Sequence, residues 1–417
     1  MTPEIKHRIE QIRRGEVPEG YVKKRKVVIP QQWGLPQIKD IASISSGSTP
    51  NRNNSEYWNG NIAWVTTGEL SSGHVNHTSE LITVKAVKET KMRIYPQGTL
   101  LMAMYGQGKT RGTVAILEID AAVNQACAAI TVKDGKSKFL FYQLKNSYQD
   151  IRKLSNTGNQ ENLNADIIKT YQVPWAPDEE QERISTILTT QDKVIELKEK
   201  RLAEKQRQKK YLMQQLLTGK KRLPGFNGAW KTDCLGKLFF ERKETNCENI
   251  EMLAITGTQG IIPRKELDLK DNSSEDKSKY LRVCVGDIGY NTMRMWQGVS
   301  AYSNYEGIVS PAYTILKPSS SINAKYFAYL FKMSEIVFLF YRFSQGLVDD
   351  TRNLKYENFK KIKVCYPPDM KEQTAIAEVL SAADREIDLL QQDIEQEKQK
   401  KKALMQLLLT GIVRVKT

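Results

Sequence analysis

The apolar residues of this chain follow two different periods, and the alternation of these periods divides the sequence into segments. Residues 31–173 contain short apolar runs such as IAWVTTGEL, ELITVKAV and GTVAILEI, separated by Gly, Asn, Ser and Pro. Such runs are typical of β-strands, and only the stretch around 138–152 has helical spacing. Residues 231–364 have the same character, with KYFAYLFKMSEIVFLFYRF as their helix. We therefore expect an α+β fold, with a mostly antiparallel sheet in each of these two segments.

Two further segments carry helical periodicity, and they repeat one another. Residues 209–219 read KKYLMQQLLTG and residues 401–411 read KKALMQLLLTG, an offset of 192 that also holds upstream. Each pattern predicts a helix of about 37 residues, roughly 55 Å long, with a coiled-coil-like apolar seam. The predicted seam residues are Ile184, Leu188, Ile195, Leu202, Leu212, Leu216, Ile376, Leu380, Ile387, Ile394, Leu404 and Leu408.

The duplication extends beyond the helices and predicts the domain organisation. SKFLFYQLK at 137–145 resembles AKYFAYLFK at 324–332, and Leu163 aligns with Leu354. Each long helix ends at Thr-Gly, which is a favourable helix C-terminus. We expect the two helices to pair antiparallel, which permits a pseudo-two-fold relation between the halves. The predicted segments are a basic N-terminal segment (1–30), globular domains (31–175 and 222–368) and long helices (176–221 and 369–417).

The charge balance narrows the choice of partners. The formal net charge is +15, from 63 Lys and Arg against 48 Asp and Glu, which favours a polyanionic partner such as nucleic acid. From charge alone, an ordinary basic protein is an equal alternative. The five cysteines are widely spread without C-x-x-C spacing, which argues against disulfides and a zinc site. The sequence shows neither a signal peptide nor an apolar run of membrane-spanning length. We expect a cytoplasmic protein that does not bind membranes.

Several motifs together identify a family. DIASISSGSTP at 40–50, GTLLMAMYGQGKTRG at 98–112, NLNADIIKTYQVPWAPDEEQERI at 162–184 and the repeated LLTG ends resemble the specificity subunit of type I restriction-modification systems. The resemblance covers essentially the whole chain. It implies two α/β target recognition domains, each of which reads half of a split site on double-stranded DNA.

The same resemblance also implies the roles of the helices and the partners. The two long helices would set the distance between the half-sites and bind two methyltransferase subunits. Those subunits would carry S-adenosylmethionine and methylate adenine, and restriction and translocase subunits would join them. The chain itself would bind no cofactor or metal and would have no catalytic residue.

The loops that differ most between the two globular domains are the candidate DNA-reading segments. AMYGQGKT at 103–110 matches a permissive phosphate-binding loop, but RGTVAILEI after it is typical of a strand, whereas such a loop needs a helix next. We interpret the segment as a glycine-rich hairpin that faces DNA, with a purely structural turn as the alternative. Arg and Gln can contact base edges, and Lys suits phosphate. The candidates in the first domain are Ser48, Thr49, Arg52, Tyr105, Gln107, Lys109, Arg111, Asn159 and Gln160.

In the second domain, YNTMRMWQG at 290–298 is the positional counterpart, although it lacks GQGKTRG. Trp296 fits a DNA contact and core packing equally well. The loop at 344–353 is a further candidate segment. The candidate residues of the second domain are Asn291, Arg294, Trp296, Gln297, Arg352 and Asn353.

Two other classes of function are alternatives to a DNA-reading subunit. A stand-alone methyltransferase needs an Asn- or Asp-Pro-Pro-aromatic element, and CYPPD at 365–369 has a different order. Nuclease-like carboxylate and lysine sets, such as Glu196 and Lys198, fall in the long helices, where solvated charges are expected. His74 and His77 have metal-like spacing, but no third ligand accompanies them. The remaining alternative is a coiled-coil scaffold that has no role on DNA.

Overall fold

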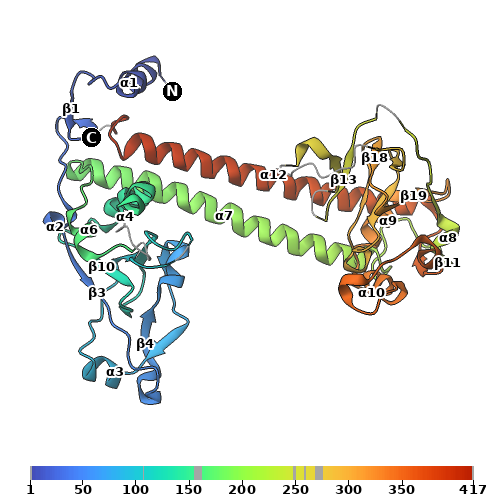
Figure 1. The fold of residues 1–417 in the computed structure, drawn as a ribbon, viewed down its shortest axis with the longest axis horizontal. Coiled ribbons are helices and arrows are strands. Elements are labelled where there is room, and N and C mark those ends of the chain that lie inside the picture. The colour runs from blue at the N-terminus through green and yellow to red at the C-terminus, as the bar shows by residue number, and fades with distance from the viewer. Residues whose placement is uncertain are drawn as a thin grey trace. The chain divides into compact units, whose positions relative to one another are not determined.

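The computed structural model describes residues 2–106, 108–154, 162–247, 250–257, 260–267 and 276–415, apart from the side chain of Asp350. The chain forms two compact units. Unit 1 consists of Met1–Leu197 and Ile394–Thr417, and unit 2 of Lys198–Asp393. The boundary crosses both long helices, so each unit contains one globular domain and one end of each helix (Figure 1).

Unit 1 is built on a five-stranded and a three-stranded sheet, in which most neighbours are antiparallel, as expected. In spatial order, the larger sheet has β3 (Ala42–Ser46), β10 (Cys127–Val132), β7 (Leu100–Ala103), β8 (Val114–Leu117) and β5 (His74–Val75). The smaller sheet has β6 (Glu80–Ile82), β4 (Trp58–Val65) and β9 (Ala121–Val123). The remaining elements are β1 (Tyr21–Lys24), β2 (Val27–Pro30), α1 (Pro3–Arg13), α2 (Ile38–Ile41), α3 (Val84–Glu89), α4 (Ser137–Asn146), α5 (Tyr148–Lys153), α6 (Ala165–Thr170) and the 3₁₀ turns η1 (Ser55–Tyr57) and η2 (Thr67–Ser72).

The five-stranded sheet of unit 1 is buried on both faces, and the alternation along each strand decides which core a residue enters. Leu100 and Met102 of β7 lie in the core that contains α4 and the ends of the long helices. Leu101 and Ala103 belong to the core on the other face, together with Val65 of the three-stranded sheet. Because successive side chains of a strand point to opposite faces, the unbroken apolar run GTLLMAM fits a strand covered on both sides.

Unit 2 has a smaller, fully antiparallel central sheet with three separate two-stranded ribbons. The central sheet has, in spatial order, β12 (Phe239–Glu241), β19 (Tyr313–Pro318), β16 (Ile288–Asn291) and β17 (Ser300–Tyr302). The ribbons are β11 (Lys231–Cys234) with β20 (Lys363–Tyr366), β13 (Leu253–Ile255) with β14 (Ile261–Pro263), and β15 (Leu281–Val283) with β18 (Gly307–Val309). The helices and 3₁₀ turns are α8 (Leu235–Leu238), α9 (Ala324–Leu330), α10 (Ser334–Phe343), α11 (Tyr356–Phe359), η3 (Arg264–Glu266), η4 (Met295–Gln297) and η5 (Asp349–Thr351).

The segment KYFAYLFKMSEIVFLFYRF forms two helices, so the prediction of one continuous helix was wrong. The chain breaks between α9 and α10, where Met333 adopts an extended conformation. Phe331 and Met333 on either side of the break are both buried in the core of unit 2. The break lets α10 turn away from α9 and pack against η4, where Gly298 approaches Val337.

The two long helices are α7 (Asp178–Leu216) and α12 (Met370–Leu408), each of 39 residues and about 58 Å long. Their first and last residues are both 192 apart, as the sequence repeat predicts. Each is followed by a glycine with φ near +70°, Gly219 and Gly411, in the left-handed region that favours glycine after a helix. Within the described residues, no helix has both the length and the hydropathy to cross a membrane.

Within each unit, α7 and α12 run antiparallel. In unit 1, Gln191 donates a hydrogen bond to Glu397, while Glu180 pairs with Arg414 beyond the end of α12. In unit 2, Lys198 pairs with Asp393 (2.8 Å) and Lys205 with Glu386 (2.9 Å). Lys198, which was expected to be a solvated charge, therefore helps to hold the two helices together.

Most of the predicted seam is buried. Leu202, Leu212 and Leu404 are half-buried, and the other nine seam residues are at most 8% exposed. The seam is not only a helix–helix interface, because Ile184 and Leu188 lie in the core of unit 1. Equivalent residues Ile376 and Leu380 lie in the core of unit 2. The globular domains therefore bury much of the stripe that the sequence analysis assigned to the helix pair and to subunit binding.

A polar cluster recurs where each helix pair meets its globular domain. In unit 1, the hydroxyl of Tyr142 on α4 donates to Asp192 (2.8 Å), which also pairs with Lys401. In unit 2, Tyr329 on α9 donates to Asp384 (2.7 Å), which pairs with Lys209. Burial raises the pKa of both tyrosines, so the hydroxyls stay protonated as donors. These contacts connect α7, α12 and the domain core in the same way in both units.

A second repeated ion pair fixes the segments that follow the helices. Arg222, after α7, binds both carboxylate oxygens of Glu372 (2.6 and 2.7 Å). Arg414, after α12, makes the same bidentate pair with Glu180. Both glutamates are about 2% exposed, so removal of either arginine leaves a buried charge without its partner.

Truncation of the equivalent buried leucines tests this packing. Leu188→Ala and Leu380→Ala are each expected to lower the free energy of unfolding by about 2–5 kcal/mol, because each leaves a cavity in a domain core. Leu197→Ala and Leu389→Ala are matched controls, because these residues are also 192 apart but are 55% and 66% exposed. The controls are expected to change stability by less than about 0.5 kcal/mol in urea titrations. Equal losses in all four variants would contradict the burial described above.

Candidate nucleic-acid interface

The strand register of unit 1 brings three loops to one end of the five-stranded sheet. Ser46 at the end of β3 pairs with Ala128, and Ala103 at the end of β7 pairs with Cys127. The loops 46–52, 103–112 and 124–126 therefore leave the sheet side by side. Thr49 donates a hydrogen bond to Gln125, which joins the first and third loops. We call this end of unit 1, with its three loops, the loop end of unit 1.

The described residues of the glycine-rich segment, 103–106 and 108–112, lie in a turn between two strands. β8 follows it, which confirms the strand expected there and leaves no helix N-terminus to face a phosphate. Tyr148 and Arg152 of α5 hold the turn by donating to the carbonyl oxygens of Lys109 (2.7 Å) and Arg111 (2.8 Å). Tyr105 is 39% exposed and Lys109 is exposed. The sequence analysis missed Tyr148 and Arg152, because the periodicity of a helix does not show which loop the helix supports.

Arg111 is buried, although it is one of the candidate DNA-contact residues. It is only 7% exposed, because the chain turns back against α5 at this point. Its side chain is therefore mostly buried in this structure, whereas the sequence analysis expects the hairpin to present Arg111 to DNA. Gln107, Asn159 and Gln160 lie outside the described residues.

Arg52 is exposed but already has partners. Its guanidinium pairs with Glu80 and stacks over the ring of Trp58 at 4.2 Å from the centroid. Ser48 is half-buried, and its carbonyl oxygen accepts a hydrogen bond from Trp64 (3.1 Å). Gln125 is an exposed amide at this end that the sequence analysis missed.

Unit 2 collects its loops in the same way. Asn291 at the end of β16 pairs with Tyr313 at the start of β19, so the loops 291–299 and 310–312 leave the sheet together. The loop at 344–353 returns to the same place, because the amide of Leu354 donates to the carbonyl of Thr292 (2.8 Å). In unit 1, Leu163 donates equivalently to Met104 (2.9 Å), which supports the predicted alignment of the two leucines. These three loops form the loop end of unit 2.

An aromatic and cationic stack joins two of the loops of unit 2. The guanidinium of Arg352 lies 3.9 Å from the ring centroid of Tyr341 on α10 and donates to its hydroxyl (2.8 Å). The ring of Trp296 meets Tyr341 edge-on at 6.1 Å. Trp296 is half-buried, and its indole N–H donates to Met293 (2.9 Å). Trp296 is therefore both packed and accessible, and Tyr341 is the positioning residue that the sequence analysis missed.

A cavity of about 220 Å³ opens between these loops. Four of the six DNA-contact candidates of the second domain line it, together with three residues that were not predicted. The lining residues are Asn291, Met293, Arg294, Trp296, Gln297, Ala312 and Asp349. Asn353, in contrast, is half-buried, and its backbone pairs with Gln345.

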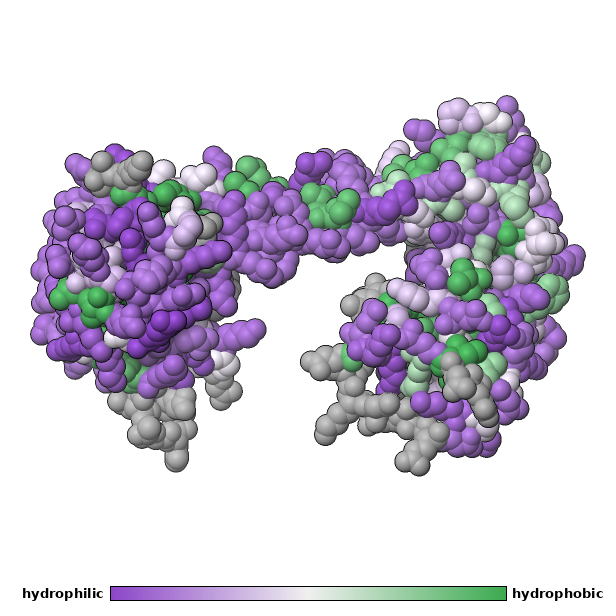
Figure 2. All heavy atoms as spheres, turned by 90° about the horizontal axis from the view of Figure 1, so that it is seen from above, coloured by the Kyte–Doolittle hydropathy of each residue, from purple (hydrophilic) through white to green (hydrophobic). Residues whose placement is uncertain are grey.

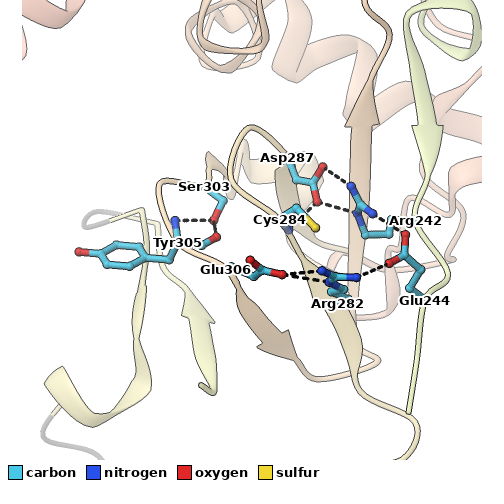
Figure 3. A network of polar contacts seen from close by, with 8 residues as sticks. All are labelled: Arg242, Glu244, Arg282, Cys284, Asp287, Ser303, Tyr305 and Glu306. Atoms are coloured by element: carbon cyan, nitrogen blue, oxygen red, sulfur yellow. Dashed lines mark hydrogen bonds and ion pairs between the residues drawn. The ribbon is translucent and has the colours of Figure 1, made fainter. Parts of the chain in front are cut away.

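Other arginines of unit 2 are held in a structural network (Figure 3). Arg242 makes a bidentate pair with the buried Asp287 (2.7 and 3.1 Å), which also accepts from the amide of Cys284. Arg282 bridges Glu244 and Glu306 (3.1 and 2.6 Å). These carboxylates raise the pKa of both arginines. The network fixes the ribbons of unit 2 and uses these guanidinium groups internally.

Arg294 differs from the arginines of that network. It is exposed at the rim of the cavity and forms no ion pair with a described residue.

Within the described part of the chain, no three His, Cys, Asp or Glu side chains are grouped to hold a metal ion. Nδ1 of His74, one of the two histidines with metal-like spacing, lies 2.8 Å from Oε1 of Glu118.

Lys332, next to α9, supports the loop that carries Arg294 and Trp296. Its ammonium donates to the carbonyl oxygens of Gly298 (2.7 Å) and Ser300 (2.6 Å), directly after η4. Desolvation by the surrounding protein, with a contribution from the charge of Lys209, lowers the pKa of Lys332 to about 8. The loop end of unit 2 is thus braced from the side of the long helices.

Comparison with known proteins agrees with this architecture. The family model of the type I restriction modification DNA specificity domain matches residues 30–207 and 236–399. The chain therefore belongs to this family, and the resemblance inferred from its motifs is confirmed.

Individual relatives show how far the similarity extends. The chain is 34% identical over 178 residues to the type I restriction enzyme MjaIX specificity subunit of Methanocaldococcus jannaschii, covering 41% of this chain and 40% of that protein. It is 24% identical over 424 residues to the MjaX specificity subunit of the same organism, and the match covers 93% of this chain and 95% of that protein. The match thus spans less than half of the first relative and nearly all of the second.

Two solved structures share the fold. The specificity subunit of the type I restriction-modification system from M. genitalium superposes with a TM-score of 0.58 at 14% identity, covering 93% of this chain and 98% of that one. A chain from a structure on complex assembly and conformational transition of the type I system gives 0.55 at 13% identity, covering 92% and 99%. The expected α+β fold with long helices is confirmed.

The pKa of Lys332 makes a testable prediction for stability. Between about pH 8 and the unfolded value near 10.5, the unfolded state holds a proton that the folded state has lost. Raising the pH through this window therefore stabilises the folded state, and below pH 8 this contribution has no slope. The stability of the wild type relative to Lys332→Met should rise from pH 8 towards 10 in denaturant titrations. A difference that stays flat or falls would contradict the lowered pKa.

Proposed function

We propose that this chain reads a two-part site on double-stranded DNA, with one half-site at the loop end of each unit. The observation that carries the proposal is that each unit gathers its most divergent loops at one end of its central sheet. Recognition residues of proteins commonly lie on loops held by a rigid scaffold. The exposed groups there include Tyr105, Lys109, Arg294 and Gln297, whose side chains suit contacts to phosphates and base edges.

The charge balance supports a DNA partner. The net charge of +15 favours association with phosphates, and lysine and arginine contacts to phosphate do not depend on sequence. Base-edge contacts from the loops would add the sequence preference. Affinity is thus expected to come from many cations, and specificity from a few loop residues.

We further propose that α7 and α12 set the distance between the half-sites and bind two methyltransferase subunits. Each helix begins in one unit and ends in the other, and each is continuous over 39 residues. On the face seen in Figure 2, the middle of the helix pair is mainly hydrophilic with small hydrophobic spots. Leu197 and Leu389 are exposed at equivalent positions of the repeat, which fits two copies of one partner.

The chemistry is assigned to the partners in this proposal. The methyltransferase subunits would bind S-adenosylmethionine and take the target adenine out of the base stack. Restriction and translocase subunits would complete the assembly. The chain described here would supply affinity, register and spacing.

A methylation assay tests the division of labour. The purified chain with S-adenosylmethionine and DNA is expected to transfer no methyl group, because the reaction is assigned to another subunit. Addition of the methyltransferase subunit should start methylation at one bipartite sequence, and binding should weaken steeply as salt is raised. Robust turnover by the chain alone, or binding that does not respond to salt, would contradict the proposal.

Substitution of Arg294 tests the location of the readers. Arg294→Ala is expected to reduce binding of the assembled complex by about 1–3 kcal/mol and to relax base preference in only one half-site. Lys317→Ala is the control, since Lys317 is exposed on β19 away from the loop end. Binding selections on duplexes randomised at both half-sites measure the effect. Relaxed preference in both halves would show that the two units do not read independently.

A further inference from the structure

We propose that the cavity in the loop end of unit 2 is a subsite for one base edge, and that Asp349 makes it selective for a base with an amino group on its major-groove edge, cytosine or adenine. The proposal rests on the proposed function, because it assumes that unit 2 faces DNA. It adds a residue that no sequence motif indicated, and a class of bases that this residue selects.

The size and lining of the cavity fit a base edge. Its 220 Å³ is several times the roughly 30 Å³ that one water occupies, so it is too large for a single bound water. Arg294, Asn291 and Gln297 offer hydrogen-bond donors, while Trp296, Met293 and Ala312 provide apolar walls. A nucleic-acid base has the same mixed character, because its polar atoms lie along its edge and its two faces are apolar.

Asp349 is the acceptor-only group in this lining, and a carboxylate is unexpected on a surface that approaches phosphates. Its charge is balanced by Arg352, whose Nε donates to Oδ1 at 2.9 Å. Arg352 is held in turn on the ring and hydroxyl of Tyr341. The carboxylate is therefore fixed in place before any ligand arrives, while the Asp349 side chain remains 62% exposed.

The chemistry of a fixed carboxylate determines which base it accepts. Cytosine N4 and adenine N6 carry amino hydrogens in the major groove, and a carboxylate accepts hydrogen bonds from them. Guanine O6 and thymine O4 carry lone pairs at the corresponding places and would be repelled. Asp349 would thus select cytosine or adenine on the strand that it faces, and Arg294 beside it would contact an acceptor on a neighbouring base.

Binding selections on randomised duplexes test the proposal with the chain assembled with its methyltransferase partner. For the wild type, one position in one half-site should prefer cytosine or adenine by about tenfold or more over guanine or thymine. Asp349→Asn should lose this preference at that position alone, because an amide both donates and accepts. Asp349→Glu should retain it in weaker form. Glu266→Gln is the matched control, as it removes another exposed negative charge elsewhere on unit 2.

Base analogues provide a test that does not depend on variants. Replacement of the selected cytosine by 2-pyrimidinone, or of adenine by purine, removes only the amino group. The wild type should then lose about tenfold in affinity, and Asp349→Asn should lose little.

The outcomes separate this inference from the proposed function. If Asp349→Asn weakens binding equally for all sequences and preserves every preference, Asp349 only positions Arg352 and the inference is overturned. The same holds if the analogues bind the wild type as well as the natural bases do. If the wild-type complex shows no sequence preference in either half-site, the proposed function itself fails.

Discussion

The burial of one stripe of each long helix in the globular cores is the constraint on which the rest of the structure depends. α7 and α12 are rich in Lys, Glu and Gln, and a helix of this kind gains most of its stability from packing its apolar face. Leu188 and Leu380 supply that packing at equivalent positions. The tyrosine–aspartate–lysine contacts around Asp192 and Asp384 then fix how each helix pair meets its domain.

Because each globular domain is held by its contacts with the helix pair, the loops at the loop ends can differ in sequence between the two units. In each unit the contacts that recur in the other unit lie on the side of the sheet that faces the helices, whereas the loops leave from the strand ends. The loops are nevertheless held in place by neighbouring helices. Tyr148 and Arg152 hold the turn in unit 1, and Tyr341 and Lys332 hold the loops of unit 2. Different loop sequences can therefore be presented on a shared and rigid support.

Structural features that repeat with a fixed period along the chain could be predicted from the sequence. The 192-residue offset between the two long helices, their antiparallel pairing, the buried seam and the alignment of Leu163 with Leu354 all follow from patterns along the chain. Features set by tertiary packing were not predictable in this way. Arg111 looks like a loop contact but is buried, and no sequence motif marks Asp349, which only the fold brings to the same cavity as Arg294. The break between α9 and α10 likewise depends on what the core must bury.

The central claim is that the helix pair sets the spacing between two independent readers. The direct test inserts one heptad into each helix at the unit boundaries, after Leu197 and after Asp393. Seven residues add about 10.5 Å and change the helix phase by only about 20°, so the seam is preserved. The bipartite site methylated by the assembled complex should gain about three unread base pairs, at about 3.4 Å each, with both half-sequences unchanged. An unchanged spacing, or a changed half-sequence, would contradict the account.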